Sequence, residues 1–255
     1  MKRVEDFIVV NHKWLNYSSF LIELEAPGKL PLIEPGNFAE IEVPNSPKVF
    51  LRRPFSIYDV DPANSLISFF VKVVGEGTRL LGETKKGDKL NMIYPLGNSF
   101  SSPVSGRVLV VAGGSGIAPF ILYGKGLQTK DTEITFLFGG RSADDIVLTE
   151  QFKALGEVLI TTEDGSLGEK GLVTQHSLFN GKRLPFDLIV TCGPEPMMKA
   201  VGKIAEERKI PCEASLENTM ACGFGACLCC IVPTSKGNKC VCTEGPVFNI
   251  KDLKW

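Results

Sequence analysis

The sequence predicts a chain of three parts: an N-terminal antiparallel β-barrel or sandwich, an α/β domain with a parallel sheet, and a small C-terminal cysteine-rich module. Short runs of Val, Ile and Phe separated by Pro and Gly fill the N-terminal part. Apolar runs then alternate with helical stretches, and six cysteines lie between Cys222 and Cys242. We expect the parts to span residues 1–102, 103–212 and 213–255.

The N-terminal part contains several short strands with turn signals between them. Pro27-Gly28 and Pro35-Gly36 are two of these signals. Such a pattern is typical of a small antiparallel barrel or sandwich. We expect strands at residues 4–10, 20–24, 38–43 and 66–74, and a helical piece at 78–83.

The second part begins after the linker-like segment 101–106. Its first strand, residues 107–112, is continuously apolar and is followed by a glycine turn and a helical stretch to about residue 127. Strands that alternate with helices predict parallel βαβ units whose strands are buried on both faces. We expect further strands at 134–138, 158–161 and 188–191, and a helix at 197–207.

Composition excludes some classes of function. The chain has 255 residues, of which 44% are hydrophobic and 22% charged, and its net charge is −1. It therefore has no basic field for nucleic acid. No segment approaches the roughly 18 apolar residues that span a bilayer, and the apolar run at 7–10 is too short for a secretory signal. We expect a cytoplasmic protein with no nucleic-acid or membrane partner.

The C-terminal cysteines carry the most specific pattern. Cys222, Cys227 and Cys230 have the spacing C-x4-C-x2-C, and Cys242 follows, which is the plant-type [2Fe-2S] pattern. A zinc ribbon is the alternative, although it usually shows two C-x2-C pairs. Cys229 competes with Cys230 as a ligand, and Cys240 competes with Cys242. Otherwise we expect Cys229, Cys240 and Cys212 to be small buried residues.

The barrel contains two motifs that suit a flavin. In the segment Arg52-Arg53-Pro54-Phe55-Ser56, an arginine can bind a pyrophosphate, an aromatic ring can stack on a flat ring, and a hydroxyl can bond to it. Gly77-Thr78 opens the helical piece, where backbone N–H groups can approach a phosphate. The alternatives are an ordinary edge strand and a plain turn.

The α/β domain contains two loops that follow strands. Gly113, Gly114 and Gly116 come directly after the first strand, the geometry that cradles the pyrophosphate of a dinucleotide, although Pro119 replaces the last glycine of the usual fingerprint. The alternative is a tight βα turn. Cys192 and Gly193 end the last apolar strand and are expected to face the same crevice.

The chain has only two histidines, His12 and His176, and neither lies near a glycine loop or an acidic cluster in the sequence. We expect both at the surface. We also expect no catalytic side chain, since hydride and electron transfer need cofactors in position rather than a protein base.

In this order the motifs resemble the ferredoxin reductase-like flavoproteins, and most closely the electron-transfer subunits of NAD-dependent dihydroorotate dehydrogenases. The resemblance covers essentially the whole chain, including Pro35–Phe38, Arg53–Ser56, Gly77-Thr78, Gly113–Pro119, Cys192–Pro194, Glu217–Cys230 and Cys242–Phe248. It departs from the family at Cys229 and Tyr94, where glycine is usual. It implies an FAD-binding barrel, an NAD-binding domain and a [2Fe-2S] module.

The resemblance also implies roles for single residues. FAD is expected at Arg53, Pro54, Phe55, Ser56, Phe70, Val71, Lys72, Gly77 and Thr78. The cluster is expected at Cys222, Cys227, Cys230 and Cys242. In related reductases a basic residue after the strand at 158–161 meets the 2′-phosphate of NADP. Here Glu163 and Asp164 stand in that region, so we expect NADH to be preferred over NADPH.

The partner implied by the resemblance is a catalytic subunit that carries FMN and oxidises dihydroorotate in pyrimidine biosynthesis. Electrons would then pass through the [2Fe-2S] cluster and FAD to NAD+, in a heterotetramer with two copies of each subunit. Two alternatives stay open. One is the small subunit of an NADH-dependent ferredoxin:NADP oxidoreductase or a sulfide dehydrogenase. The other is a zinc-ribbon interaction protein that is not an enzyme.

Overall fold

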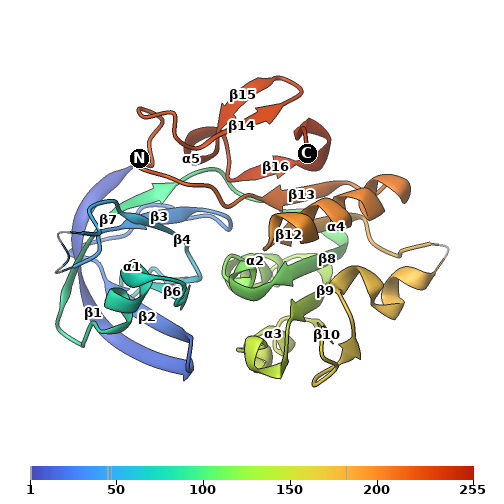
Figure 1. Cartoon of the computed structure of the whole chain (residues 1–255), viewed down its shortest axis with the longest axis horizontal. Helices are drawn as coiled ribbons and strands as arrows, with labels where there is room; N and C mark the ends of the chain where they lie inside the picture. Colours follow the sequence, from blue (N-terminus) through green and yellow to red (C-terminus); the bar gives the residue numbers. More distant parts are fainter. Residues whose placement is uncertain (1, 45, 47, 182) are drawn as a thin grey trace.

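The structure is a computed structural model that describes residues 2–44, 46, 48–181 and 183–255. It confirms the predicted fold class. Figure 1 shows a curled antiparallel sheet beside a second sheet with helices on its faces, and the C-terminal module lies across the top of both. In the part of the chain that the structure describes, every helix is too short or too polar to cross a membrane.

The N-terminal sheet has seven strands in the order β4-β3-β7-β1-β2-β6-β5, and all neighbours are antiparallel. Alternate residues of each strand point into the curl, where Phe7, Phe20 and Phe69 are fully buried. The elements of this part are β1 (Arg3–Asn16), β2 (Ser19–Glu25), β3 (Phe38–Ile41), β4 (Arg53–Ser56), β5 (Asp59–Asp61), β6 (Leu66–Lys72), α1 (Glu76–Gly82) and β7 (Lys89–Leu96).

The second sheet has the order β11-β10-β9-β8-β12-β13-β16, and only its β13–β16 pair is antiparallel. Its strands are β8 (Ser105–Gly113), β9 (Asp131–Gly140), β10 (Glu157–Thr162), β11 (Glu169–Lys170), β12 (Leu188–Cys192), β13 (Cys212–Ser215) and β16 (Val247–Asn249). Helices α2 (Phe120–Leu127), α3 (Thr149–Lys153) and α4 (Glu195–Glu207) cover its faces, with short turns η1 (Gly114–Ile117), η2 (Ala143–Asp145), η3 (Val173–Gln175) and η4 (Ser177–Asn180).

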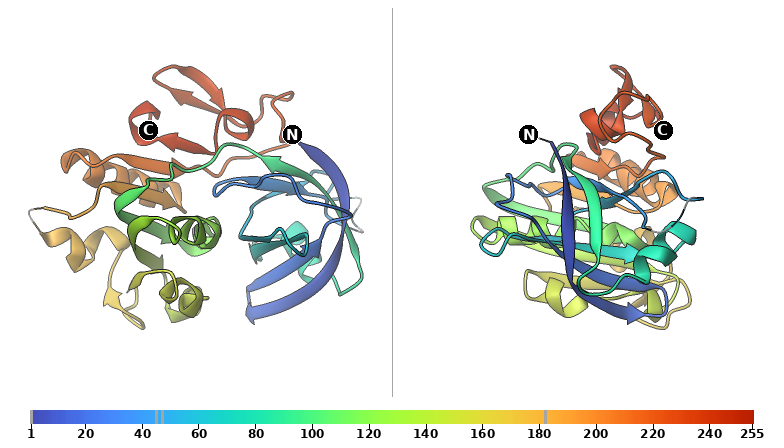
Figure 2. Two further views of the ribbon diagram at one scale, coloured as in Figure 1. Left: turned by 180° about the vertical axis from the view of Figure 1, so that it is seen from behind. Right: turned by 90° about the vertical axis from the view of Figure 1, so that its left-hand side faces the viewer.

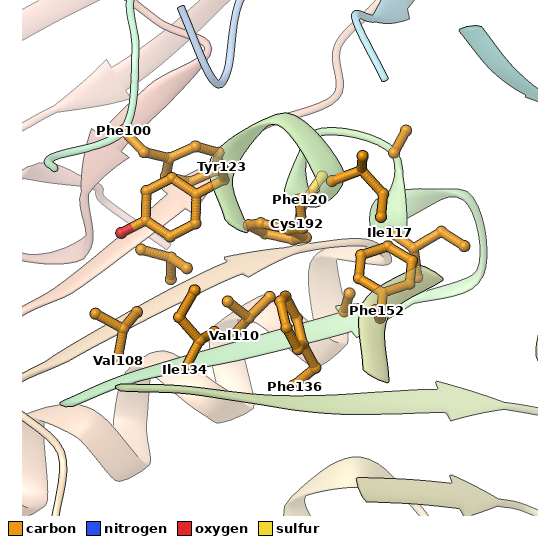
Figure 3. Close-up of a cluster of buried hydrophobic side chains, with 14 of the residues drawn as sticks. Phe100, Val108, Val110, Ile117, Phe120, Tyr123, Ile134, Phe136, Phe152 and Cys192 are labelled. Atoms are coloured by element: carbon orange, nitrogen blue, oxygen red, sulfur yellow. The ribbon is translucent and has the colours of Figure 1, made fainter. Parts of the chain in front are cut away.

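Aromatic rings fill the core between this sheet and helices α2 and α3. Figure 3 shows Phe120 of α2 above Val110 of β8, with Phe136 and Phe152 beside it. The Phe136 and Phe152 rings meet edge to face, with centroids 5.1 Å apart. This packing holds the carboxyl ends of β8 and β12 in a fixed position, and those ends carry the predicted binding loops.

The cysteine-rich module consists of a long loop, the hairpin β14 (Ile231–Thr234) and β15 (Gly237–Cys240), α5 (Val241–Glu244), β16 and η5 (Ile250–Asp252). Both views of Figure 2 show it at one end of the molecule. The expected boundary between residues 212 and 213 passes through β13, and β16 pairs with that strand. The module is therefore joined to the parallel sheet by backbone hydrogen bonds.

Asn98 fixes the module to the barrel. Its side-chain amide donates to the carbonyl of Val247 over 2.9 Å and accepts from the Val247 backbone N–H over 3.0 Å. Gly97 packs against Pro246 so closely that a Cβ there would lie 2.4 Å from the proline ring. The cysteines are thus held at a defined place relative to the barrel strands.

Candidate functional site

A pocket of about 570 Å³ lies between the barrel and the C-terminal half of the chain, and we call it the barrel pocket. One wall comes from β3, β4, β6 and the start of α1. The opposite wall comes from the loops after β8, β12 and β13. Its lining residues are Phe38, Arg53, Pro54, Phe55, Ser56, Phe70, Lys72, Val74, Thr78, Ser115, Ala118, Cys192, Ser215, Leu216, Glu217, Asn218, Thr219, Met220 and Pro246.

Seven of the nine residues expected at FAD line this pocket, and the other two lie behind it. The side chain of Val71 is only 1% exposed and packs in the barrel core, because it points to the opposite face of β6 from Phe70 and Lys72. Gly77 supports the arginine instead: a Cβ there would lie 3.1 Å from Nε of Arg53. Glycine therefore lets the guanidinium rest on the first turn of α1.

Only one of the two neighbouring arginines reaches the pocket. Arg52 donates to the Glu42 carboxylate over 2.8 Å and to the Asn91 carbonyl over 2.9 Å, which directs it away. Arg53 donates to the carbonyl of Leu51 over 2.8 Å and keeps further N–H groups at the pocket wall. Arg53 is thus the arginine placed to meet an anionic group.

A second pocket, of about 390 Å³, lies at the carboxyl edge of the parallel sheet, and we call it the nucleotide pocket. Gly113 and Gly114 line it as expected. Its other lining residues are Lys72, Gly139, Gly140, Arg141, Asp145, Glu163, Gly171, Leu172, Val173, Thr174, Pro194, Pro196, Met197 and Ala200.

The two loops expected to share a crevice touch each other. A Cβ on Gly116 would lie 2.1 Å from the carbonyl oxygen of Cys192, and one on Gly193 would lie 2.9 Å from the carbonyl oxygen of Gly113. The contact exists because β8 and β12 are parallel neighbours, with Ala112 beside Cys192. Cys192 itself lines the barrel pocket, and burial raises the pKa of its thiol.

Lys72 lines both pockets and joins the two domains. Its ammonium lies 2.6 Å from a carboxylate oxygen of Asp145, on the turn after β9. Burial favours the neutral form of Asp145, but the hydrogen bonds from Lys72 and from the backbone of Arg141 outweigh it and keep the pKa below its ordinary value. A cation therefore stands where the two pockets meet.

The acidic residues expected to select the coenzyme separate in the structure. Glu163 lines the nucleotide pocket, whereas Asp164 does not and instead accepts hydrogen bonds from Ser166. Sequence reasoning missed Gly139, Gly140, Arg141 and Asp145. The signal was present, because Gly139-Gly140 ends an apolar strand and the carboxyl ends of parallel strands form the ligand edge.

The loop Cys222–Cys230, which we call the cysteine loop, directs backbone amides at a sulfur. The N–H of Cys227 lies 3.5 Å from Sγ of Cys222. Burial favours the neutral thiol, but hydrogen bonds from the amides of Cys227, Phe224 and Ala226 outweigh it and lower the pKa of Cys222 to about 6. A thiolate with converging N–H donors fits an iron–sulfur cluster, which cysteine thiolates hold.

Cys230 and Cys242 lie next to each other. The buried Cys242 donates its N–H to Sγ of Cys230 over 3.4 Å, which makes a second pair. Two pairs fit the two irons of a [2Fe-2S] cluster. Among the described residues, no three His, Cys, Asp or Glu side chains converge as the ligands of a single metal ion do.

The other three cysteines were expected to be buried. Cys212 is buried, but the expectation is wrong for Cys229, which the loop exposes, and for Cys240, which is partly exposed.

The expectation that both histidines lie at the surface is also wrong. His176 is 7% exposed, and its Nδ1 accepts the backbone N–H of Leu178 over 3.0 Å, which caps a short turn. His12 is partly buried because its ring stacks on Phe20, with centroids 4.6 Å apart. Neither ring lines the barrel pocket or the nucleotide pocket.

Two family models match the chain. Residues 217–254 match the iron-sulfur cluster binding domain of dihydroorotate dehydrogenase B, and residues 110–203 match an oxidoreductase NAD-binding domain. Both assignments agree with the fold class expected from the sequence. The first covers the cysteine loop together with Cys242, and the second covers the glycine turn after β8.

Curated relatives match along the full length. The electron transfer subunit of dihydroorotate dehydrogenase B (NAD+) from Desulforamulus reducens is 36% identical over 100% of both chains. The protein of the same name from Caldanaerobacter subterraneus is 39% identical over 94% of both.

Solved structures show the same architecture. The structure of an NADH-dependent reduced ferredoxin-NADP oxidoreductase, described for flavin-based electron bifurcation, superposes with a TM-score of 0.88 at 31% identity, over 98% of this chain and 90% of that one. The cytochrome b5 reductase domain of Ulva prolifera nitrate reductase shares the fold, with a TM-score of 0.68 at 18% identity over 82% of this chain and 94% of that one. Because the curated relatives match over nearly the whole chain, this chain belongs to the family of electron transfer subunits of dihydroorotate dehydrogenase B.

Proposed function

We propose that this chain is the electron transfer subunit of an NAD-linked dihydroorotate dehydrogenase in pyrimidine biosynthesis. It takes electrons from a catalytic subunit that carries FMN and oxidises dihydroorotate, and it delivers them to NAD+. The observation that carries the proposal is the match over the whole chain to relatives of that name. We further propose a cytoplasmic heterotetramer with two copies of each subunit.

The barrel pocket is the proposed FAD site. Arg53 and the first turn of α1, with Gly77 and Thr78, offer positive charge and backbone N–H groups to the phosphates. Pro54, Phe55, Ser56 and Phe70 offer flat apolar surface and a hydroxyl to the ring system. Lys72 lines the pocket, and Val71 holds β6 in the barrel core. When bound, FAD and the [2Fe-2S] cluster supply the two-electron and one-electron chemistry that the reaction needs.

The nucleotide pocket is the proposed NAD site. Gly113 and Gly114 leave space for a pyrophosphate beside the backbone, while Gly116, Cys192 and Gly193 keep the two loops in contact. Cys222, Cys227, Cys230 and Cys242 are the proposed cluster ligands. The barrel pocket borders both of the other proposed sites, because its lining includes Lys72, which also lines the nucleotide pocket, and Met220, two residues before Cys222.

The experiment that tests this function joins the chain to its partner. The chain is purified with its cofactors and mixed with a dihydroorotate-oxidising subunit that contains FMN. We expect dihydroorotate to reduce NAD+ only when both subunits are present. The proposal fails if the two proteins form a complex, each with its cofactors, and NAD+ stays oxidised.

Glu163 is expected to set the coenzyme preference. In Glu163→Lys the acidic wall of the nucleotide pocket becomes cationic, so the ratio of kcat/KM for NADPH to that for NADH should rise about tenfold or more, which corresponds to about 1.4 kcal/mol. Asp164→Lys makes the same change of charge one residue further along, outside the pocket, and should leave the ratio nearly unchanged. Steady-state kinetics with both coenzymes measure it, and equal ratios in the two variants would contradict the assignment.

The exposed apolar side chains of the cysteine loop are the proposed contact with the catalytic subunit. Phe224 and Leu228 are 52% and 57% exposed although both are large and apolar. Phe224→Asp should raise the dissociation constant of the complex about tenfold or more. Leu32→Asp, at an 81% exposed apolar residue of the barrel part, is the matched control. Calorimetric titration measures both, and unchanged affinity in Phe224→Asp removes this surface from the interface.

A further inference from the structure

Glu40 of β3 is buried without a partner. Its side chain is fully buried, and neither carboxyl oxygen has a hydrogen bond, which is true of no other carboxyl group in the described ranges. Burial is the main reason that the pKa of Glu40 is raised, to about 7. A buried, unpaired carboxyl is unfavourable in a folded protein, so its position calls for a physical reason.

The cations near Glu40 donate to groups other than its carboxyl, and Arg52 reaches only its backbone carbonyl, over 3.4 Å. Arg52 gives its side-chain N–H groups to the Glu42 carboxylate and to the Asn91 carbonyl. Arg53 donates to the carbonyl of Leu51. Both guanidinium groups favour the ionised form of Glu40 through charge alone, while Cys222 opposes it. The carboxyl therefore has no ion-pair partner, although the charges of Arg52, Cys222 and Arg53 all act on it.

The side chain of Glu40 lies directly beneath the cysteine loop. Glu40 and Phe38 point to the face of β3 that is covered by the C-terminal module, whereas Ala39 and Ile41 point into the barrel core. A Cβ on Gly223, which follows Cys222, would lie 2.8 Å from Cγ of Glu40. The loop therefore rests on this side chain, and the φ of +72° at Gly223 permits the close approach.

The backbone of Glu40 borders the barrel pocket as well. Glu40 pairs with Pro54 of β4, one of the residues that line that pocket. Glu40 therefore contacts the proposed cluster loop through its side chain and the proposed flavin-binding strand β4 through its backbone. The reduction potential of an iron–sulfur cluster depends on the charge and the hydrogen bonds around it, and a charge acts strongly where water is excluded.

We propose that the carboxylate of Glu40 lowers the reduction potential of the cluster held by the cysteine loop. The inference rests on the proposed cluster site. An ionised carboxylate beneath the loop opposes the arrival of a further negative charge. It therefore favours the passage of electrons from the loop toward the barrel pocket.

The test compares Glu40→Gln with Glu42→Gln in the purified chain with its cofactors. Glu42 lies on the same segment, but its side chain is 60% exposed and bonds to Arg52, so its removal changes the same charge without touching the cysteine loop. A redox titration followed by electron paramagnetic resonance at about pH 9, well above the usual range of a carboxyl group, gives the cluster potential. At a fixed applied potential we expect about tenfold more reduced cluster in Glu40→Gln, or about 59 mV, and no such change in Glu42→Gln.

Two further variants separate the charge of Glu40 from the size of its side chain. Glu40→Asp retains the charge and should hold the cluster potential close to that of the wild type. Glu40→Met is neutral and of similar size, and should raise the potential as Glu40→Gln does. An unchanged potential in a neutral variant that carries its cluster overturns the proposal. So does loss of the cluster from both neutral variants when Glu40→Asp keeps it, because that result indicates a purely structural role. A wild-type chain without any cluster signal contradicts the cluster site itself.

Discussion

Replacing Cys222 with serine is expected to abolish the iron–sulfur cluster and to lower dihydroorotate-driven reduction of NAD+ by at least about 100-fold. The reason is local. Backbone amides of the loop converge on Sγ of Cys222 and lower the pKa of its thiol to about 6, so that it is largely a thiolate near neutral pH. A serine hydroxyl at the same place stays protonated. Iron content and the paramagnetic resonance signal of the reduced protein measure the effect.

Cys229→Ser is the matched control for this variant, because Cys229 belongs to the same loop but is exposed. It should retain the cluster and the activity. Reduction of an artificial dye by NADH, which needs only the barrel pocket and the nucleotide pocket, should persist in both variants and shows that the fold is intact. A cluster that survives in Cys222→Ser and disappears in Cys229→Ser would mean that the ligand set is wrong.

Gly116→Ala is expected to lower the stability of the fold strongly. The added Cβ would lie 2.1 Å from the carbonyl oxygen of Cys192 and 2.4 Å from its carbonyl carbon. Both are backbone atoms held in the parallel sheet, so no side chain can move to relieve the clash, and β8 and β12 must separate at their ends. We expect the free energy of unfolding to fall by about 3–5 kcal/mol, and the affinity for NADH to fall with it.

Gly28→Ala is the control, because a Cβ at Gly28 meets nothing within 4 Å. Its free energy of unfolding should stay within about 0.5 kcal/mol of the wild type. Urea unfolding followed by circular dichroism measures both variants under the same conditions. Equal stability of Gly116→Ala and Gly28→Ala would show that the glycine turn after β8 does not pack on the loop after β12.

The fold was largely predictable because its strands carry local signals. Runs of Val, Ile and Phe predicted β2, β6, β8, β9, β10 and β12 to within a few residues. The expected strand at 4–10 was too short, since β1 continues to Asn16 through a mixed polar and apolar segment that pairs with β2 and is only partly buried. No strand was expected at Lys89–Leu96, although β7 alternates buried and more exposed residues along its whole length. Pro95 and the charged and polar residues at its start weaken the local strand signal.

The candidate site also has a part that the sequence predicts and a part that it does not. The cysteine spacing and the glycine turns lie within single loops, so the sequence was enough to single them out. Lys72 meets Asp145 across 73 residues of chain, and Glu40 meets Gly223 only because the C-terminal module folds back over β3. Local periodicity carries no information on such contacts. Alternation along a strand places Glu40 on the same face as Phe38. That face is buried only because the C-terminal module packs on it.

Addition of NADH to the purified chain with its cofactors, without oxygen, tests most directly that electrons cross between the nucleotide pocket and the cysteine loop. We predict that NADH bleaches the flavin and produces the paramagnetic resonance signal of a reduced [2Fe-2S] cluster. In Cys222→Ser only the flavin should bleach. A wild-type chain in which NADH reduces the flavin while the cluster stays oxidised, although dithionite can reduce it, would contradict the account.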